Sequence, residues 1–291
     1  MRGGQALVVI LLILAVALTV GLSVVSRSVT DVGVSTTSEE SARALAAAEA
    51  GIETALSTAG VVVGTPVNVG QTGKITGSYT ILSSDPSGGG DSVTFPEGVK
   101  AGDPATVFLV AHTADGQLDT SAGAAKYTGP SFVVCWGENI TANTTPALEV
   151  MLYYINSSGL ALANRNVYDP TAKRTPGAVA SLDSPASGCP GDKNYAFKKE
   201  INFASALPAG GLSMPASFTP LFLRFKLLYN GDTAYPIGVV GDNDQFPAQA
   251  RLITAVGQAG QTNRRVEVNE RYPDPLPYFD SAVFSGDDLS K

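Results

Sequence analysis

"GGQALVVILLILAVALTVGLSVVSRS", residues 3–28, decides the fold. The twenty residues from Ala6 to Val25 carry no charge, and only three of them are not strongly apolar: Thr19, Gly21 and Ser23. An α-helix rises about 1.5 Å per residue, so a helix of this length crosses the roughly 30 Å hydrocarbon core of a bilayer. The stretch therefore predicts a membrane-spanning helix.

The charges on either side of this run predict its orientation. Arg2 precedes the run and Arg27 is the first charge beyond it. We expect Arg2 on the cytoplasmic side and everything after Arg27 outside the cytoplasm. A removable secretory signal is the alternative, because residues 24–26 (Val-Val-Ser) are small enough for a cleavage site. The apolar run is, however, longer than the 7–15 residues typical of such a signal.

The segment after Arg27 continues the helical pattern. Residues 28–57 contain no proline and only two glycines, Gly33 and Gly51. Apolar or small residues recur at steps of three or four, which indicates an amphipathic helix to about Leu56. They are Val25, Val29, Val32 and Thr36, then Ala42, Leu45, Ala48, Ile52 and Ala55. The whole helix would hold about fifty residues and be roughly 75–80 Å long.

The rest of the chain favours β structure. Nine short segments beyond Lys74 alternate apolar and polar residues or are rich in β-branched and aromatic ones, which is typical of strands. "YNGDT" and "AVGQAGQTNRR" are turn signals between neighbouring strands. We predict an α+β fold: a long N-terminal, membrane-anchored helix of pilin-like form, followed by a mostly antiparallel β-sandwich-like domain.

"RGGQALVVILLILAVALTVGL" and "ARALAAAEAGIE" together carry a resemblance that covers residues 2–56. A short basic leader ending in glycine, an apolar segment and an uninterrupted amphipathic helix resemble type IV pilin-like proteins, in particular minor pilins of the PilX-like class. In such proteins a prepilin peptidase cuts after the leader glycine. The resemblance implies a cut after Gly4, with Gly3 as the alternative, leaving Gln5 as the first residue.

Together, the resemblance for the leader and the residue patterns for the rest divide the chain into five parts. These are a leader (1–4), a transmembrane part (5–26), an amphipathic continuation (27–58), a linker (59–74) and an extracytoplasmic β-rich domain (75–291).

Val9 departs from the usual pilin pattern. Most pilins carry a glutamate at the fifth position after the cut, where it pairs with the amino terminus of a neighbouring subunit. Counted from Gln5, that position is Val9. A buried carboxylate is costly unless paired, so its absence removes the need for a subunit ahead. The largest minor pseudopilin of type II secretion also lacks this glutamate. Val9 therefore favours a minor subunit, one that can lie at a filament tip.

The expected function is structural. The chain would be a minor pilin or pseudopilin, stored in the cytoplasmic membrane and incorporated into, or capping, a type IV pilus-like filament. Its partners would be other pilin subunits through the first helix, the membrane and prepilin peptidase. The alternative is a membrane-anchored surface protein whose β domain is a ligand-binding or adhesion module outside any filament. The mature amino terminus separates the two.

Composition and motifs argue against other classes. The net charge is −7 and no Lys/Arg stripe occurs, so nucleic acid is not an expected partner. His112 is the one histidine, and no G-x-S-x-G elbow accompanies it, so we expect a strand-edge residue and not a catalytic one. We predict no enzyme activity, no cofactor and no metal.

Three smaller features remain. Cys135 and Cys189 are the only cysteines, and an even count in an exported domain predicts a disulfide, with two unlinked thiols as the alternative. "GDNDQF" places Asp242, Asn243 and Asp244 in a row, which fits ordinary turn chemistry better than a calcium loop. Three N-x-S/T triplets, at Asn139, Asn143 and Asn156, indicate surface loops.

The alanine-rich stem has two interpretations. Alanine is the best helix former, so the composition could serve propensity alone. Small residues also let helices approach closely, which favours bundling with the first helices of other subunits. The residues concerned are Ala42, Ala44, Ala46, Ala47, Ala48 and Ala50.

Overall fold

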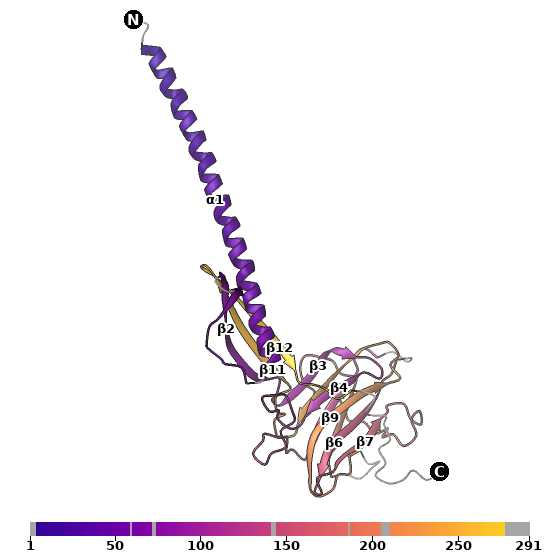
Figure 1. Cartoon of the computed structure of the whole chain (residues 1–291). Helices are drawn as coiled ribbons and strands as arrows, with labels where there is room; N and C mark the ends of the chain where they lie inside the picture. The colour runs from indigo at the N-terminus through magenta and orange to yellow at the C-terminus, as the bar shows by residue number, and fades with distance from the viewer. Residues whose placement is uncertain are drawn as a thin grey trace, which may run out of the picture. The chain divides into compact units, whose positions relative to one another are not determined.

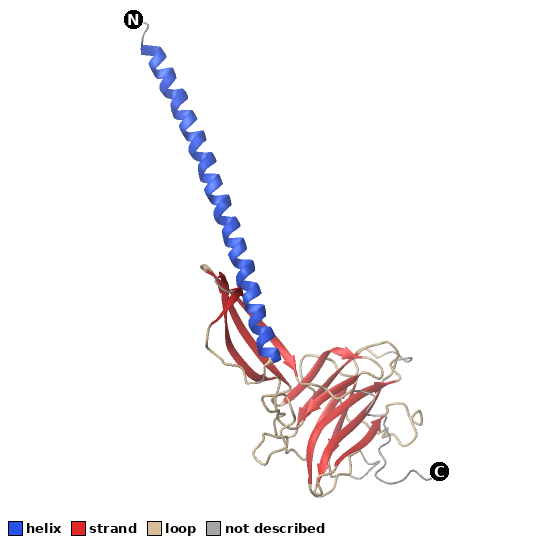
Figure 2. Cartoon of the chain, viewed as in Figure 1, coloured by secondary structure: helices blue, strands red, loops and turns tan. Residues whose placement is uncertain are grey.

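The computed structural model describes residues 4–58, 60–71, 74–140, 144–185, 187–204 and 210–276. Within these ranges one helix is followed by twelve strands. The elements are α1 (Gly4–Ser57), β1 (Val67–Gln71), β2 (Lys74–Ser87), β3 (Ser92–Val99), β4 (Pro104–Phe108), β5 (Ser131–Trp136), β6 (Ala147–Asn156), β7 (Ala161–Tyr168), β8 (Phe197–Asn202), β9 (Phe218–Leu228), β10 (Tyr235–Gly241), β11 (Ala250–Ala259) and β12 (Thr262–Arg271). One long N-terminal apolar helix followed by strands confirms the α+β class (Figure 2).

The strands form three sheets of four. Their orders are β1-β2-β11-β12, β3-β10-β5-β8 and β4-β9-β6-β7. Every strand pair whose register is described is antiparallel. The chain divides into two compact units: unit 1 comprises residues 1–84 and 253–268, and unit 2 comprises residues 85–252 and 269–291.

Unit 1 contains α1 and most of the sheet β1-β2-β11-β12. The C-terminal part of α1 lies along this sheet, while no other described element accompanies its N-terminal part (Figure 1). The buried cluster between them joins helix residues to β2 and β11: Ile52, Ala55, Tyr79, Ile81, Ile253 and Ala255. The strand residues alternate along the chain, so one face of the sheet carries the contact.

Unit 2 contains the other two sheets, whose buried side chains form one cluster. Val93, Trp136 and Ile237 come from β3-β10-β5-β8, and Leu148 and Phe225 come from β4-β9-β6-β7. A smaller cluster around Phe108 and Phe222 includes Tyr272, the residue after β12. Burial of large apolar side chains, at about 1.5–3 kcal/mol each, therefore holds the two sheets of unit 2 together.

The strand predictions need one set of corrections. All nine expected segments contain a strand, but three further strands exist. β1 lies inside residues 59–74, which were expected to be a linker, and β3 and β7 were also missed. β3 contains Pro96 and Gly98, and β7 reads "ALANRNVY", so neither alternates cleanly. The expected single β domain from residue 75 is also divided, because part of its sheet belongs to unit 1 with the helix.

Candidate functional site: the exposed helix and the sheet that holds its stem

The N-terminal part of α1 exposes its apolar side chains. Leu7–Ser57 is long and apolar enough to cross a membrane by length and composition, and none of its most apolar window is buried within the protein. Fourteen large hydrophobic side chains between Leu7 and Val25 are each 55–65% exposed. At about 1.5–3 kcal/mol each, covering them is worth roughly 20–40 kcal/mol. That exceeds the stability of a typical domain, so this surface needs an apolar environment.

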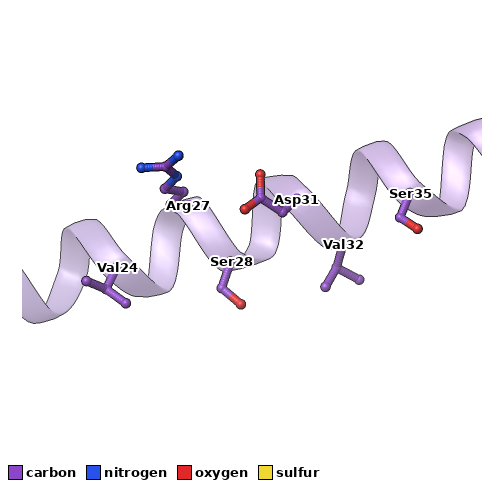
Figure 3. A pocket seen from close by; sticks show the side chains of 6 residues that line it. All are labelled: Val24, Arg27, Ser28, Asp31, Val32 and Ser35. Atoms are coloured by element: carbon purple, nitrogen blue, oxygen red, sulfur yellow. The ribbon is translucent and has the colours of Figure 1, made fainter.

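The character of the helix changes at Arg27. Figure 3 shows Arg27 and Asp31, one turn apart, projecting from the same side of α1, while Val24, Ser28, Val32 and Ser35 project from the opposite side. Opposite charges four residues apart stabilise a helix by about 0.2–0.5 kcal/mol. This turn is the first charged position after the apolar run, where the expected membrane-spanning part ends.

The following stretch, residues 28–38, is exposed and makes its polar contacts internally. Thr30, Thr36 and Thr37 donate hydroxyl hydrogen bonds to backbone carbonyls one turn earlier, each at 2.9 Å. Threonine commonly bonds in this way inside helices. The outer surface of the stretch is consequently less polar than its sequence indicates, with Val29, Val32 and Val34 all more than 60% exposed.

The C-terminal part of α1 packs on the sheet at backbone distance. A Cβ added to Gly257 in β11 would lie 1.9 Å from the carbonyl oxygen of Ala44 and 2.4 Å from the nitrogen of Ala48. Across the same contact, a Cβ on Gly51 would lie 2.9 Å from the Tyr79 ring. Glycine inside a strand often marks such close approach of another backbone. The helix–sheet contact therefore depends on small residues on both sides.

The alanine-rich stem is thus partly used within the chain. Ala44, Ala47 and Ala48 are at most 2% exposed against the sheet. Ala42 and Ala46 are exposed, as is Leu45 of the expected apolar stripe. Bundling through all the alanines, the interpretation favoured from the sequence, is therefore unavailable to three of them. The expected stripe is right at Ala48, Ile52 and Ala55, which are buried, and wrong at Ala42 and Leu45, because alanine lies on every side of this part of the helix.

Polar contacts hold both ends of the stem. Glu40 accepts hydrogen bonds from the backbone N–H of Gln261 and the hydroxyl of Thr262, at 3.3 and 3.4 Å. Ser41 accepts two hydrogen bonds from the guanidinium of Arg264, at 2.8 and 2.6 Å. Farther along, the hydroxyls of Thr54 and Tyr79 lie 3.1 Å apart. The partners of Glu40 and Ser41 lie more than two hundred residues farther along the chain. Local sequence patterns do not reveal such distant contacts.

The expected processing residues lie at the start of α1. Gly4 and Gln5 are helical, and Gly3 lies outside the described residues. Val9 is 57% exposed on the apolar surface. No described side chain is packed around this position, so Val9 faces whatever environment covers the helix.

Cys135 and Cys189 form the expected disulfide, with their Cα atoms 5.8 Å apart. Cys135 is fully buried in β5, and Cys189 lies in the loop before β8. A Cβ on Gly238 in β10 would lie 2.5 Å from Pro190, so the loop lies directly on this strand. The bond therefore holds the loop against the sheet β3-β10-β5-β8.

His112 lies near a strand end, as expected, but in an aromatic environment. Its ring stacks on Tyr272 at 3.8 Å and meets the edge of Phe108 at 4.4 Å. Burial lowers the pKa of His112 from 6.5 to about 4. Nδ1 is buried and has no hydrogen-bond partner among the described residues.

The acidic loop at Asp242–Asp244 makes structural hydrogen bonds. Asp244 accepts bonds from the backbone N–H and hydroxyl of Thr128, and the N–H bond is the main cause of its lowered pKa. Asp242 and Glu200 both lie 3.0 Å from the hydroxyl of Ser131. No group of three or more His, Cys, Asp or Glu suited to a metal occurs in the described ranges.

Two of the three sequon asparagines fall on described turns. Asn139 is exposed after β5 with a φ of 51°. Asn156 closes the turn between β6 and β7, where its side-chain oxygen accepts the N–H groups of Ser158 and Leu160 at 3.0 and 2.9 Å. Asn143 lies outside the described residues.

Comparisons of the chain with family models, with curated proteins and with solved structures give no match.

Proposed function

We propose that the chain is a structural minor pilin or pseudopilin, stored in the cytoplasmic membrane and incorporated into, or capping, a type IV pilus-like filament. The observation that carries the proposal is the combination within α1. Its N-terminal part exposes fourteen large apolar side chains, and its C-terminal part is held on the chain's own sheet. Such a helix can pass from a bilayer into a bundle of helices without exposing its apolar surface to water.

The proposed topology places Arg2 in the cytoplasm and the sheets outside. The membrane-spanning part would end near Arg27, and the exposed stretch 28–38 would contact the first helices of other pilin subunits. Ala42 and Ala46 remain available for such contacts because they face away from the sheet. We interpret the shared core of unit 2 as that of a β-sandwich displayed at the cell or filament surface. No catalytic step or cofactor is part of this proposal.

The test is the mature amino terminus of the protein extracted from membranes. Prepilin peptidase would cut after Gly4, so mass spectrometry should find Gln5 as the first residue. Gly4→Val should retain the four leader residues, whereas the matched variant Gly3→Val should still be cut. A mature chain beginning near Arg27 would contradict the proposal. An uncut chain beginning at Met1 would favour the anchored surface protein.

A second test concerns filament position. Val9→Glu introduces a carboxylate that a tip subunit cannot pair, and an unpaired charge costs several kcal/mol in a bilayer. The variant should be less abundant in membranes and no more abundant in sheared filaments, measured by quantitative immunoblotting. Val8→Glu is the matched control, since it adds the same charge one residue away. If Val9→Glu alone becomes an abundant filament component, the tip assignment is wrong.

A further inference from the structure

A groove of about 750 Å³ lies along β3 in unit 2. Every residue from Ser92 to Val99 lines it. In a strand, successive side chains point to opposite faces, so a groove that touches consecutive residues follows the edge of the strand. Pro104 and Thr106 line the groove as well, and they belong to β4, an edge strand of the other sheet of unit 2. The groove therefore lies between one edge of each sheet.

The edge of β3 is free for hydrogen bonding. β3 pairs with β10 alone in its sheet, and the N–H of Gly241 donates to the carbonyl of Asp91 at 2.9 Å. In an antiparallel pair, the residues whose backbone groups face the partner alternate along the strand. Asp91 and Val93 therefore bond toward β10, and the backbone N–H and C=O groups of Ser92 and Thr94 point away from it. Neither of these two residues has a backbone partner on that side among the described residues.

The free edge is short and fits one strand. The register with β10 shifts after Phe95, where three residues of β3 stand opposite one of β10. The first of the three is Pro96, which has no N–H to donate. An added strand would therefore exchange bonds with Ser92 and Thr94, which takes about five residues of strand. With about 3.4 Å per residue, about 4.8 Å between strands and about 10 Å between sheets, such a segment fills roughly 800 Å³. This is close to the volume of the groove.

Each of the other edge strands of unit 2 has backbone groups bonded by another part of the chain. On β4, the side-chain amide of Gln249 bonds both backbone groups of Phe108, at 2.7 and 2.9 Å. On β7, the carbonyl of Val167 accepts the N–H of Val179 at 2.8 Å, and Asp183 donates its N–H to β8 at 2.9 Å. Proteins cover free edges in such ways because an open edge pairs with other chains. The regular part of β3 has no such cover in the part of the chain that the structure describes.

The groove is acidic at one end. Glu97 and Asp103 line it where β3 leads into β4, and neither carboxylate has an ion-pair partner among the described residues. The N–H of Asp103 donates to the carbonyl of Lys100 at 3.2 Å in the turn between the strands, and Lys100 does not line the groove. Arg271 is the one cation among the described lining residues, and its guanidinium carbon lies 5.5 Å from the centroid of the Phe95 ring. The end at the turn is therefore complementary to a basic side chain.

We propose that the free edge of β3 binds an extended segment of a partner protein as an added antiparallel strand, with a lysine or arginine of that segment at Glu97 and Asp103. An antiparallel strand begins at this end of the groove, and antiparallel pairing is the more stable arrangement per residue. Bonds to the backbone of Ser92 and Thr94 provide the affinity, and the acidic end provides the preference for a basic residue. Because the groove has the volume of a single strand, it fits a separate segment better than the edge of a second folded sheet. The proposal concerns unit 2 alone and does not depend on assembly into a filament.

The test is amide hydrogen exchange of the full chain in detergent with capped pentapeptides as probes. The first is acetyl-Lys-Thr-Val-Thr-Val-amide, the second has glutamate in place of lysine, and the third has the residues of the first in reverse order. At saturation, the first peptide should slow exchange of the Ser92 and Thr94 amides roughly tenfold. The amides of Val93 and Val239, which already bond between β3 and β10, should not change. The glutamate peptide should need an at least about threefold higher concentration for the same protection.

Two results with these peptides would contradict the proposal. If none of them slows exchange of Ser92 and Thr94, the edge does not bind extended segments and the proposal is overturned. If the reversed peptide protects these amides better than the first, the added strand is parallel and the proposed direction is wrong.

Substitutions separate the contribution of the edge from that of the acidic end. Thr94→Pro removes an outward N–H without touching the bonds to β10, so the lysine peptide should no longer protect Ser92. Thr94→Ala keeps the N–H and should respond as the wild-type protein does. Glu97→Gln combined with Asp103→Asn should remove the difference between the lysine and glutamate peptides. Unchanged exchange of Val239 in each variant shows that the sheet is intact.

The protein without peptide gives the last outcomes. If Ser92 and Thr94 are protected there and lose this protection on dilution, a second copy of the chain occupies the edge and the assignment to a different partner is wrong. If they are protected at every concentration, the chain covers its own edge and the proposal is overturned.

Discussion

Unit 1 packs its helix with alanine and glycine, whereas unit 2 packs its sheets with large side chains. In unit 1 the contact between α1 and β11 brings backbone atoms together at Gly257 and Ala44. In unit 2 the largest fully buried side chains include Trp136, Tyr127 and Phe132. A contact between backbones has no side chain that can move aside. A core of large side chains can relax partly by changing rotamers.

The two units also differ in what their contacts hold in place. The stem of α1 carries a long apolar segment that contacts no described element, so any force on that segment reaches the chain's sheets through the stem. A close contact with hydrogen bonds at Glu40, Ser41 and Thr54 fixes the stem in one position. Unit 2 instead has a disulfide and a continuous core.

The largest expected effect is that of Gly257→Val. Its Cβ would fall 1.9 Å from a backbone oxygen, so neither side can yield without moving a strand or the helix. We expect a loss on the order of 5 kcal/mol in the stem–sheet contact, above the usual 1–3 kcal/mol for overpacking. Amides of Ile253 and Ala255 should exchange much faster in the detergent-solubilised chain, while those of β6 should not change.

Gly33→Val is the matched control for that substitution. Gly33 lies in the same helix, and an added Cβ there meets nothing within 4 Å. Valine is slightly better than glycine in a helix, so the stem–sheet contact should be unaffected. If the β11 amides of Gly257→Val exchange at the same rate as in the wild-type protein, the stem is not held against β11 in the way described.

The second prediction concerns the disulfide of unit 2. Replacing Cys135 and Cys189 together by alanine opens a loop of 54 residues, which should cost roughly 4 kcal/mol in the chain-entropy model. The loss should appear as faster exchange in β5, β8 and β10, with unit 1 unchanged. In the wild-type protein, denaturation without reduction should leave both cysteines unreactive to a maleimide. Labelling of both would contradict the bond.

The sequence predicted the helix and nine strands because their patterns are local. A run of twenty uncharged, mostly apolar residues and a short run of alternating β-branched residues can each be recognised from neighbouring residues alone. β3 was missed because Pro96 and Gly98 interrupt it, and these residues are tolerated there because β3 is an edge strand.

The buried face of the stem was predictable only in its C-terminal half, at Ala48, Ile52 and Ala55. Alanine occurs at six positions between residues 42 and 50, so periodicity alone cannot choose among its faces. The choice is made by Gly257, which lies in a strand some two hundred residues along the chain and leaves room for the helix backbone at Ala44 and Ala48. Gly257 inside the strand pattern "ARLITAVGQ" (residues 250–258) was the available signal, because a glycine within a strand often marks a close backbone approach.

The third prediction compares two neighbouring alanines of the stem, one buried and one exposed. Ala47 is 2% exposed against the sheet, whereas its neighbour Ala46 is exposed. Ala47→Leu should cost about 1–3 kcal/mol by overpacking the stem contact, and Ala46→Leu should be nearly neutral. Exchange of the β11 amides measures both. If Ala46→Leu has no effect there but lowers incorporation into filaments, that face also serves the proposed bundling. If the two substitutions change the exchange of the β11 amides equally, the assignment of Ala47 and not Ala46 to the buried face is wrong.

The smallest expected effect comes from His112 in unit 2. Burial between Tyr272 and Phe108 lowers its pKa to about 4, below its ordinary value of 6.5. Between these values the unfolded chain binds a proton that the folded chain does not. Its contribution to stability is therefore complete above pH 6.5 and is lost as the pH falls toward 4. His112→Phe keeps a ring at this position and removes the titration. The thermal midpoint of the wild-type protein should fall more steeply than that of His112→Phe between pH 6.5 and 4.5. Subtracting the two curves removes the contribution of carboxylates such as Asp244. Parallel curves would show that His112 accepts its proton equally well in both states, and that its ring is not buried between the two aromatic side chains.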